Sequence, residues 1–344
     1  MSFKIFLLTK KKLERSNSPT IHKIQNLKPE TIRIGTRDSE LALWQANKVK
    51  SALENLGYKT QLVPVKSEGD LNLDQPLYEM GITGIFTKTL DVAMITGKVD
   101  IAVHSMKDVP TTLPKGIVEA AILQRASYKD ILLHKGLGFL KQEQGIIASG
   151  SLRRKAQWLN KYPNHQVVDL RGNVNTRMQK LKDNNWNGAI FAEAGLERLG
   201  FLNNGKQIQS PSFGGVGEDL DWMLPAPAQG AMLVVAMEKD THIREVLAKL
   251  NHHETETCVH IEREFLKVLE GGCTAPIGAL ATINGDEIHF EGNLLSLDGT
   301  QKYSVQKTVS IEESTGLGQL CAKELLNNGG RELMSEIKKE LNKN

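Results

Sequence analysis

The sequence has no long hydrophobic run. Nowhere in its 344 residues do eighteen apolar residues follow one another, so no segment is long enough to cross a membrane as a helix. Cysteine is also scarce. Cys258, Cys273 and Cys321 are too few for a disulfide framework, and no CxxC pair indicates zinc or thioredoxin-like chemistry. This cysteine usage predicts a reducing, cytoplasmic location.

The chain also has little net charge. The formal charge is +3, with 40% hydrophobic and 24% charged residues, which is typical of a globular protein. So small a charge offers no general argument for nucleic acid, and we expect neither a nucleic-acid nor a membrane partner. The length allows two or three domains.

Two nucleotide-binding motifs are missing. There is no GxxxxGK[ST] loop and no GxGxxG between a strand and a helix, which disfavours a nucleotide ligand. The glycine-rich stretch 214–217 has no flanking strand or helix pattern, so we predict a loop there. Residues 1–30 are basic and irregular, and the apolar run 5–8 is too short for a secretory signal. We predict a disordered extension, with a targeting peptide as the alternative.

A β-like run followed by a turn and a helical pattern recurs through the first two hundred residues. The β-like runs are 31–34, 100–103, 145–148, 167–170 and 189–192. Alternating strands and helices predict an α/β protein with mostly parallel sheets. The pattern changes after His252, where a helix over 254–269 precedes three β-like runs. Hairpin turns at Asn284-Gly285 and Asp298-Gly299 and a final helix over 312–327 predict a small α+β domain with an antiparallel sheet.

Basic and hydroxyl side chains gather where the predicted strands end and helices begin. Helix N-termini at the carboxyl ends of strands are common anion sites. The set is Arg37, Ser39, Lys107, Ser149, Ser151, Arg153, Arg154, Arg171 and Arg177. Arginine pairs with carboxylates and phosphates through two parallel hydrogen bonds. Without a nucleotide motif, we predict a ligand that carries several carboxylates.

Arg153 and Arg154 stand in the first turn of a predicted helix. The helix dipole disfavours cations there by a few tenths to about 1 kcal/mol each. Two such residues in one turn indicate that an anion lies beside them. The alternative is that both arginines face solvent.

Three further candidates concern chemistry. Asp108, beside Lys107 after a buried strand, either stabilises a developing cation or forms an ordinary ion pair. Cys273, in a glycine-rich loop, is accessible and either catalytic or idle, whereas Cys258 and Cys321 fit helical core patterns. The histidines near Cys258 match no zinc spacing, so we predict no metal site.

Taken together, these residues resemble the porphobilinogen deaminase family from about residue 31 to the final helix. The matching segments are 35–39 with 41–45, 104–110, 151–154, 170–173 with 176–177, 251–254 and 269–273. The resemblance implies two doubly wound domains like type-II periplasmic binding proteins, plus a small α+β domain that carries the cysteine. The implied division is 31–124 with 225–250, then 125–224, then 251–344.

The resemblance also implies an activity. The family is a transferase that joins four porphobilinogen molecules head to tail, with loss of ammonia, into hydroxymethylbilane for tetrapyrrole and haem biosynthesis. Its primer is a dipyrromethane cofactor, held here by a thioether to Cys273, and its catalytic aspartate corresponds to Asp108. The cofactor-binding residues would be Ser39, Lys107, Ser149, Ser151, Arg153 and Arg154. The residues for porphobilinogen and the growing polypyrrole chain would be Arg37, Gln45, Arg171, Gly172 and Arg177.

Some positions depart from the family pattern. Glu68 and Thr83 replace frequent basic residues in the loop 67–86, an active-site lid in the family, and Glu40 stands where proline is frequent. We expect a monomer. Two rivals remain: a carboxylate-binding module on the same scaffold, and a member of the family that has lost turnover.

Overall fold

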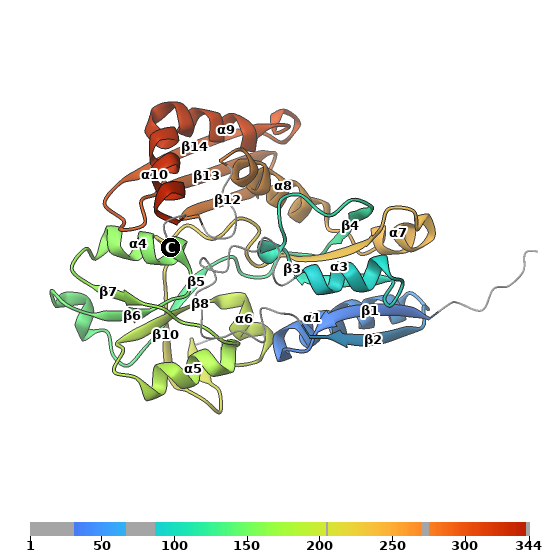
Figure 1. The fold of residues 1–344 in the computed structure, drawn as a ribbon, viewed down its shortest axis with the longest axis horizontal. Coiled ribbons are helices and arrows are strands. Elements are labelled where there is room, and N and C mark those ends of the chain that lie inside the picture. The colour runs from blue at the N-terminus through green and yellow to red at the C-terminus, as the bar shows by residue number, and fades with distance from the viewer. Residues whose placement is uncertain (1–30, 67–86, 204–205, 270–274, 342–344) are drawn as a thin grey trace, which may run out of the picture.

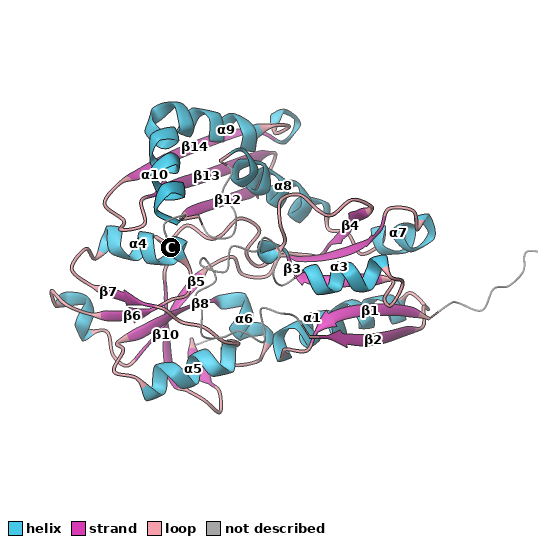
Figure 2. Ribbon diagram, viewed as in Figure 1, coloured by secondary structure: helices cyan, strands magenta, loops and turns pink. Residues whose placement is uncertain are grey.

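The protein forms three sheets, each with its own helices (Figures 1 and 2). The structure is a computed structural model that describes residues 31–66, 87–203, 206–269 and 275–341. The predicted α/β class and the small antiparallel C-terminal sheet are confirmed. No helix within these ranges is long and apolar enough to span a membrane.

The first sheet has the strand order β2-β1-β3-β11-β4. Its strands are β1 (Ile32–Arg37), β2 (Thr60–Val65), β3 (Ile101–Ser105), β4 (Ile117–Ile122) and β11 (Met232–Met237). The helices of this unit are α1 (Glu40–Asn55), α3 (Lys88–Ile95) and α7 (Thr241–Ala248). β1 runs parallel to β2 and β3, whereas β11 runs antiparallel to β3 and β4.

The second sheet has the order β7-β6-β8-β5-β10-β9. Its strands are β5 (Asp130–His134), β6 (Ile146–Ala148), β7 (Gln166–Val168), β8 (Gly188–Ala192), β9 (Gln207–Gln209) and β10 (Gly214–Asp219). Its helices are α4 (Leu152–Lys161), α5 (Val174–Asp183) and α6 (Glu193–Arg198). β6 is parallel to β7 and β8, and β5 is antiparallel to β8 and β10.

Two predictions about these sheets were wrong. Both sheets are mixed rather than mostly parallel, because the chain crosses between them after β4 and returns as β11, and the strands at these crossings pair antiparallel. The glycine-rich stretch 214–217 is part of β10 rather than a loop. Glycine suits this strand because a Cβ on Gly217 would lie 2.4 Å from a methyl carbon of Ile131 on β5.

The C-terminal sheet has three antiparallel strands: β12 (Ile277–Asn284), β13 (Glu287–Leu295) and β14 (Lys302–Ser310). Gly285 and Gly299 take positive φ values in the two connecting turns, as the hairpin prediction required. Helices α8 (His253–Val268), α9 (Leu317–Leu325) and α10 (Arg331–Leu341) pack with the sheet. The prediction of one final helix ending at 327 was wrong, because a second helix follows a kink at Gly329, whose φ is 105°.

A close approach of α8 and α9 gives a first testable prediction. A Cβ on Gly318 would lie 2.0 Å from the backbone oxygen of Ile261, which no rotamer change can relieve. Gly318→Ala is therefore expected to lower the free energy of unfolding by about 1–3 kcal/mol. Gly138→Ala is the matched control, since nothing lies within 4 Å of its Cβ position. Denaturant unfolding of both variants measures the difference; equal values would contradict the close approach.

A buried ion pair joins the three units. Glu262 on α8 is fully buried, and its carboxylate pairs with Arg125 of the first crossing segment at 2.6 Å. The same carboxylate accepts the backbone N–H of Ala228 at 2.6 Å and that of Ala281 at 2.9 Å. Ala228 belongs to the second crossing segment and Ala281 to β12. One carboxylate therefore holds the C-terminal unit against both chain crossings.

Candidate active site

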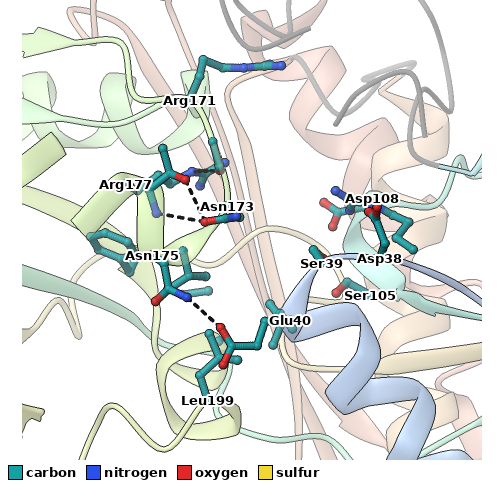
Figure 3. Close-up of a pocket in the computed structure, with 18 of the residues that line it drawn as sticks. Asp38, Ser39, Glu40, Ser105, Asp108, Arg171, Asn173, Asn175, Arg177 and Leu199 are labelled. Atoms are coloured by element: carbon teal, nitrogen blue, oxygen red, sulfur yellow. Dashed lines mark hydrogen bonds between the residues drawn. The ribbon is translucent and has the colours of Figure 1, made fainter. Parts of the chain in front are cut away.

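A cavity of about 520 Å³ lies between the first two sheets, within the range of small-molecule sites (Figure 3). Most of the sequence-predicted residues line it. They are Arg37, Ser39, Lys107, Asp108, Arg154, Arg171, Gly172 and Arg177. Residues from the first unit and residues from the second therefore face the same cavity, as expected for side chains at strand ends and helix N-termini.

The first wall is built from the parallel strands β1 and β3. Because these strands end at the same edge of the sheet, Arg37 and the turn after Ser105 come together. Ser39 caps α1, its hydroxyl accepting the backbone N–H of Ala42 at 3.4 Å. A short 3₁₀ turn after β3 carries Lys107 and Asp108 to the cavity. The wall thus offers a helix N-terminus together with cationic and carboxylate side chains.

Lys107 lies in a partly buried position that changes its acidity. Its ammonium group donates to the side-chain oxygen of Gln229 at 3.3 Å. Burial lowers the pKa of Lys107 to about 8, although Asp108 nearby acts in the opposite direction. Burial together with Arg37 lowers the pKa of His104, behind this wall, to about 4. At neutral pH, Lys107 is therefore mostly charged and His104 is neutral.

The second wall comes from the N-terminus of α5. Asn173 caps this helix, its side-chain oxygen accepting the backbone N–H of Thr176 at 2.9 Å. Arg177, in the next turn, donates a hydrogen bond from its Nε–H to the carbonyl oxygen of Gly172 at 2.7 Å. Figure 3 shows Arg171, Asn173 and Arg177 on the side of the cavity opposite Ser39 and Asp108.

Positive charge is concentrated along this second wall. Burial, together with repulsion from the neighbouring Arg154 and Arg171, lowers the pKa of Arg177 to about 10. Arginines that repel one another in a partly desolvated cavity are stabilised by an anionic ligand. The geometry therefore favours a ligand with more than one carboxylate.

Arg153 and Arg154 have a partner that the sequence reasoning missed. Both are buried, with exposed fractions of 4% and 5%, so the solvent-facing alternative is wrong. Asp130 accepts from Arg153 at 2.7 Å and from Arg154 at 2.8 and 3.0 Å, and also from Gln229 at 2.9 Å. Burial alone would raise the pKa of the Asp130 carboxyl, but the two arginines hold it well below its usual range.

Four predicted residues do not line the cavity. Arg153 is turned to Asp130 and the carbonyl of Leu224, and Gln45 is buried with its amide donating to the hydroxyl of Ser105 at 2.9 Å. Ser151 caps α4 through the backbone N–H of Arg154, and Ser149 accepts the N–H of Ser151. Cys273 and the loop 67–86, with Glu68 and Thr83, lie outside the described residues.

The sequence reasoning also missed members of the wall. Lys66 directly follows β2, so the strand-end rule that selected the other cations would have found it. Glu40, noted only as a departure from the family pattern, accepts a hydrogen bond of 2.7 Å from Asn175 of α5 (Figure 3). This bond joins the first two units beside the cavity. Within the described ranges, no group of three or more His, Cys, Asp or Glu could hold a metal ion.

The fold and the cavity define an α/β protein with an arginine-lined cavity between two sheet-and-helix units. Comparison with known proteins identifies the family. The model "porphobilinogen deaminase, dipyromethane cofactor binding domain" matches residues 32–245, and "porphobilinogen deaminase, C-terminal domain" matches residues 256–327. The chain belongs to the porphobilinogen deaminase family.

Individual relatives agree. The porphobilinogen deaminase of Geobacter metallireducens is 41% identical over 90% of this chain and 95% of its own length. That of Desulfitobacterium hafniense is 41% identical over 91% of this chain and 99% of its own length. Among solved structures, the periplasmic VFT2 domain of Bordetella pertussis BvgS has a TM-score of 0.39 at 10% identity, covering 64% of this chain and 86% of that domain.

Proposed function

We propose that this chain is the transferase that joins four porphobilinogen molecules head to tail, with loss of ammonia, into hydroxymethylbilane for tetrapyrrole and haem biosynthesis. The observation that carries this proposal is the arginine-lined cavity with Asp108 in its wall, in a chain that belongs to the porphobilinogen deaminase family. No observation favours the alternative of a carboxylate-binding module without turnover.

The residues present fit the dipyrromethane cofactor. Each pyrrole ring of this cofactor carries two carboxylates, and the cavity offers arginines from both walls. The buried Nε of Arg153 has no hydrogen-bond partner among the described residues, so its N–H remains able to donate a hydrogen bond. When bound, the cofactor supplies an electron-rich pyrrole carbon as the primer of the chain. We assign its binding to Ser39, Lys107, Ser149, Ser151, Arg153 and Arg154, with attachment at Cys273.

Asp108 is the proposed catalytic residue. Departure of ammonia from porphobilinogen leaves positive charge on the substrate, and a carboxylate already fixed in the cavity wall stabilises that charge without reorganisation. Arg37, Arg171, Gly172 and Arg177 would bind the carboxylates of the substrate and the growing chain. Gln45 would act through its hydrogen bond to Ser105, which lines the cavity.

The lowered pKa of Lys107 predicts a pH dependence of binding. Its charged form pairs with the carboxylates of the bound cofactor and predominates below pH 8, so the hold on the cofactor should weaken and kcat of the loaded enzyme should fall as the pH rises above 8. The measurement is kcat for porphobilinogen between pH 7 and pH 9.5. In Lys107→Met, kcat should be low at every pH and should lose its dependence in this window. A wild-type dependence that persists in Lys107→Met would assign it to another group.

Four further assignments belong to the proposal. We propose domain boundaries at 31–124 with 225–250, 125–224 and 251–344, supported by the position of β11 in the first sheet. We also propose a monomer without a nucleic-acid or membrane partner, in the cytoplasm. The free, buried thiols of Cys258 and Cys321 are consistent with a reducing compartment.

The decisive experiment is the intact mass of the purified protein beside a Cys273→Ala variant. We expect an excess equal to one dipyrromethane in the wild type and the bare chain mass in the variant. Ammonia release from porphobilinogen, measured on the same samples, should follow the excess mass. A bare wild-type mass that stays unchanged after incubation with porphobilinogen would reject the proposed reaction.

A further inference from the structure

A second cavity, of about 460 Å³, lies at the junction of the first two units and takes no part in the function proposed above. We call it the junction pocket. It is lined by residues of α1, of the crossing segment after β4, of the end of α6 and of the start of β11. They are Trp44, Lys48, Ala52, Leu123, Gln124, Arg125, Ala126, Glu197, Arg198, Met232 and Leu250.

The junction pocket combines an apolar surface with an unusual arginine. Trp44 is 38% exposed, so much of its indole borders open space. The Arg198 guanidinium lies 5.7 Å from the centre of that indole and donates to the carbonyl of Gly230 at 2.6 Å. Within the described part of the chain, no carboxylate lies within 4 Å of it. A partly buried guanidinium that donates to a carbonyl and lies over a ring, with no ion pair of its own, is suited to receive a carboxylate.

The other charges of the pocket limit the ligand to one negative charge. Arg125 is already neutralised by the buried Glu262, at 2.6 and 3.1 Å. Glu197 and Lys48 are both exposed, and the negative charge of Glu197 acts on the neighbouring Arg198. Because no carboxylate pairs with Arg198 within 4 Å among the described residues, its guanidinium can still receive one carboxylate, and Glu197 would repel a second anionic group. Leu123, Met232 and the open part of the Trp44 ring suit an aromatic body.

The junction pocket shares two helices with the active-site cavity. On α1, Leu41 lines the active-site cavity and Trp44, one turn on, lines the junction pocket. On α6, Leu199 follows the helix into the active-site cavity, whereas Arg198 faces the junction pocket. A ligand held between Trp44 and Arg198 would therefore fix α1 against α6, and with them the separation of the two walls.

We infer that the junction pocket binds an aromatic monocarboxylate, which bridges α1 and α6 and slows turnover by holding the two units in one arrangement. The binding stands on the geometry of the pocket alone. The effect on turnover rests on the proposed function.

The test uses 2-naphthoate as the probe, with the cofactor-loaded full-length protein. Calorimetry should detect binding, and the neutral analogue 2-naphthamide should bind about tenfold more weakly or worse, because it cannot pair with Arg198. Arg198→Gln should weaken 2-naphthoate to a similar extent. Ala52→Phe, which fills the pocket from α1, should abolish binding and keep the wild-type rate of ammonia release. Arg244→Gln is the matched control, since Arg244 also donates to a carbonyl but is exposed on α7.

Kinetic measurements show which of the two cavities the probe occupies. We expect 2-naphthoate to lower kcat with little change in KM for porphobilinogen, and to lose this effect in Ala52→Phe. A rise in KM alone would place the probe in the active-site cavity and overturn the inference, as would undiminished binding to Ala52→Phe or no binding to the wild type. Folding of each variant is checked by thermal unfolding. Absence of ammonia release without any probe would reject the proposed function instead, and would leave the calorimetric result standing.

Discussion

Asp108→Ala is expected to lower kcat for porphobilinogen by at least about 10²–10³-fold while KM and the melting temperature change little. The carboxylate lies in the cavity wall, next to Lys107 and across from Arg171 and Arg177. In these surroundings its negative charge can stabilise a cation that develops on the substrate. Its effect should therefore appear in the chemical step rather than in binding.

Asp38→Asn is the comparison that makes this result specific. Asp38 is a second carboxylate in the same cavity wall, and the substitution removes one charge from the same space. Single-turnover ammonia release from cofactor-loaded protein measures both variants. A large loss confined to Asp108→Ala supports the catalytic assignment. Equal losses would assign the effect to the total charge of the cavity, and near-normal turnover in Asp108→Ala would reject the role.

Asp130→Asn is expected to lower the free energy of unfolding by about 3–5 kcal/mol. The substitution keeps the shape of the side chain but leaves Arg153 and Arg154, both buried, without the carboxylate that neutralises them. Because these groups are desolvated in the folded state, their uncompensated charge acts directly on folding. The variant should also take up less cofactor, since the first turn of α4 loses the anchor that orients both arginines.

The free energy comes from denaturant unfolding at neutral pH, with Asp221→Asn as the control. Asp221 pairs with Lys129 at 2.7 Å but is 69% exposed, so its loss should cost less than about 1 kcal/mol.

The contribution of Asp130 to stability also depends on pH, with a defined sign. The pKa of Asp130 is depressed in the folded state, so its contribution is present above the ordinary carboxyl pKa and is lost as the pH falls. Wild-type and Asp130→Asn stabilities should therefore converge in acid; equal stability at pH 7 would contradict the ion-pair argument.

Much of the local structure could be predicted from the sequence because it depends on neighbours in the chain. The hydroxyl of Ser39, the amide of Asn173 and the glycines of the two hairpins act within a few residues, and the helix starts and turns that they set fall where predicted. The final helix shows the limit. The pattern ended it at 327, but the chain uses Gly329 to turn into a second helix that completes the C-terminal core.

The sequence by itself was enough to predict most of the cationic side chains that line the cavity from strands that end at a common sheet edge. Parallel strands place their carboxyl ends together, so residues that follow them can be selected without coordinates. Only the tertiary structure decided the partner of the double arginine. β5 runs antiparallel to β8, with Asp130 opposite Ala192, so the beginning of β5 lies at the edge where β6 and β8 end. A rule that considers only residues after strands cannot find a carboxylate that arrives at that edge from the opposite direction.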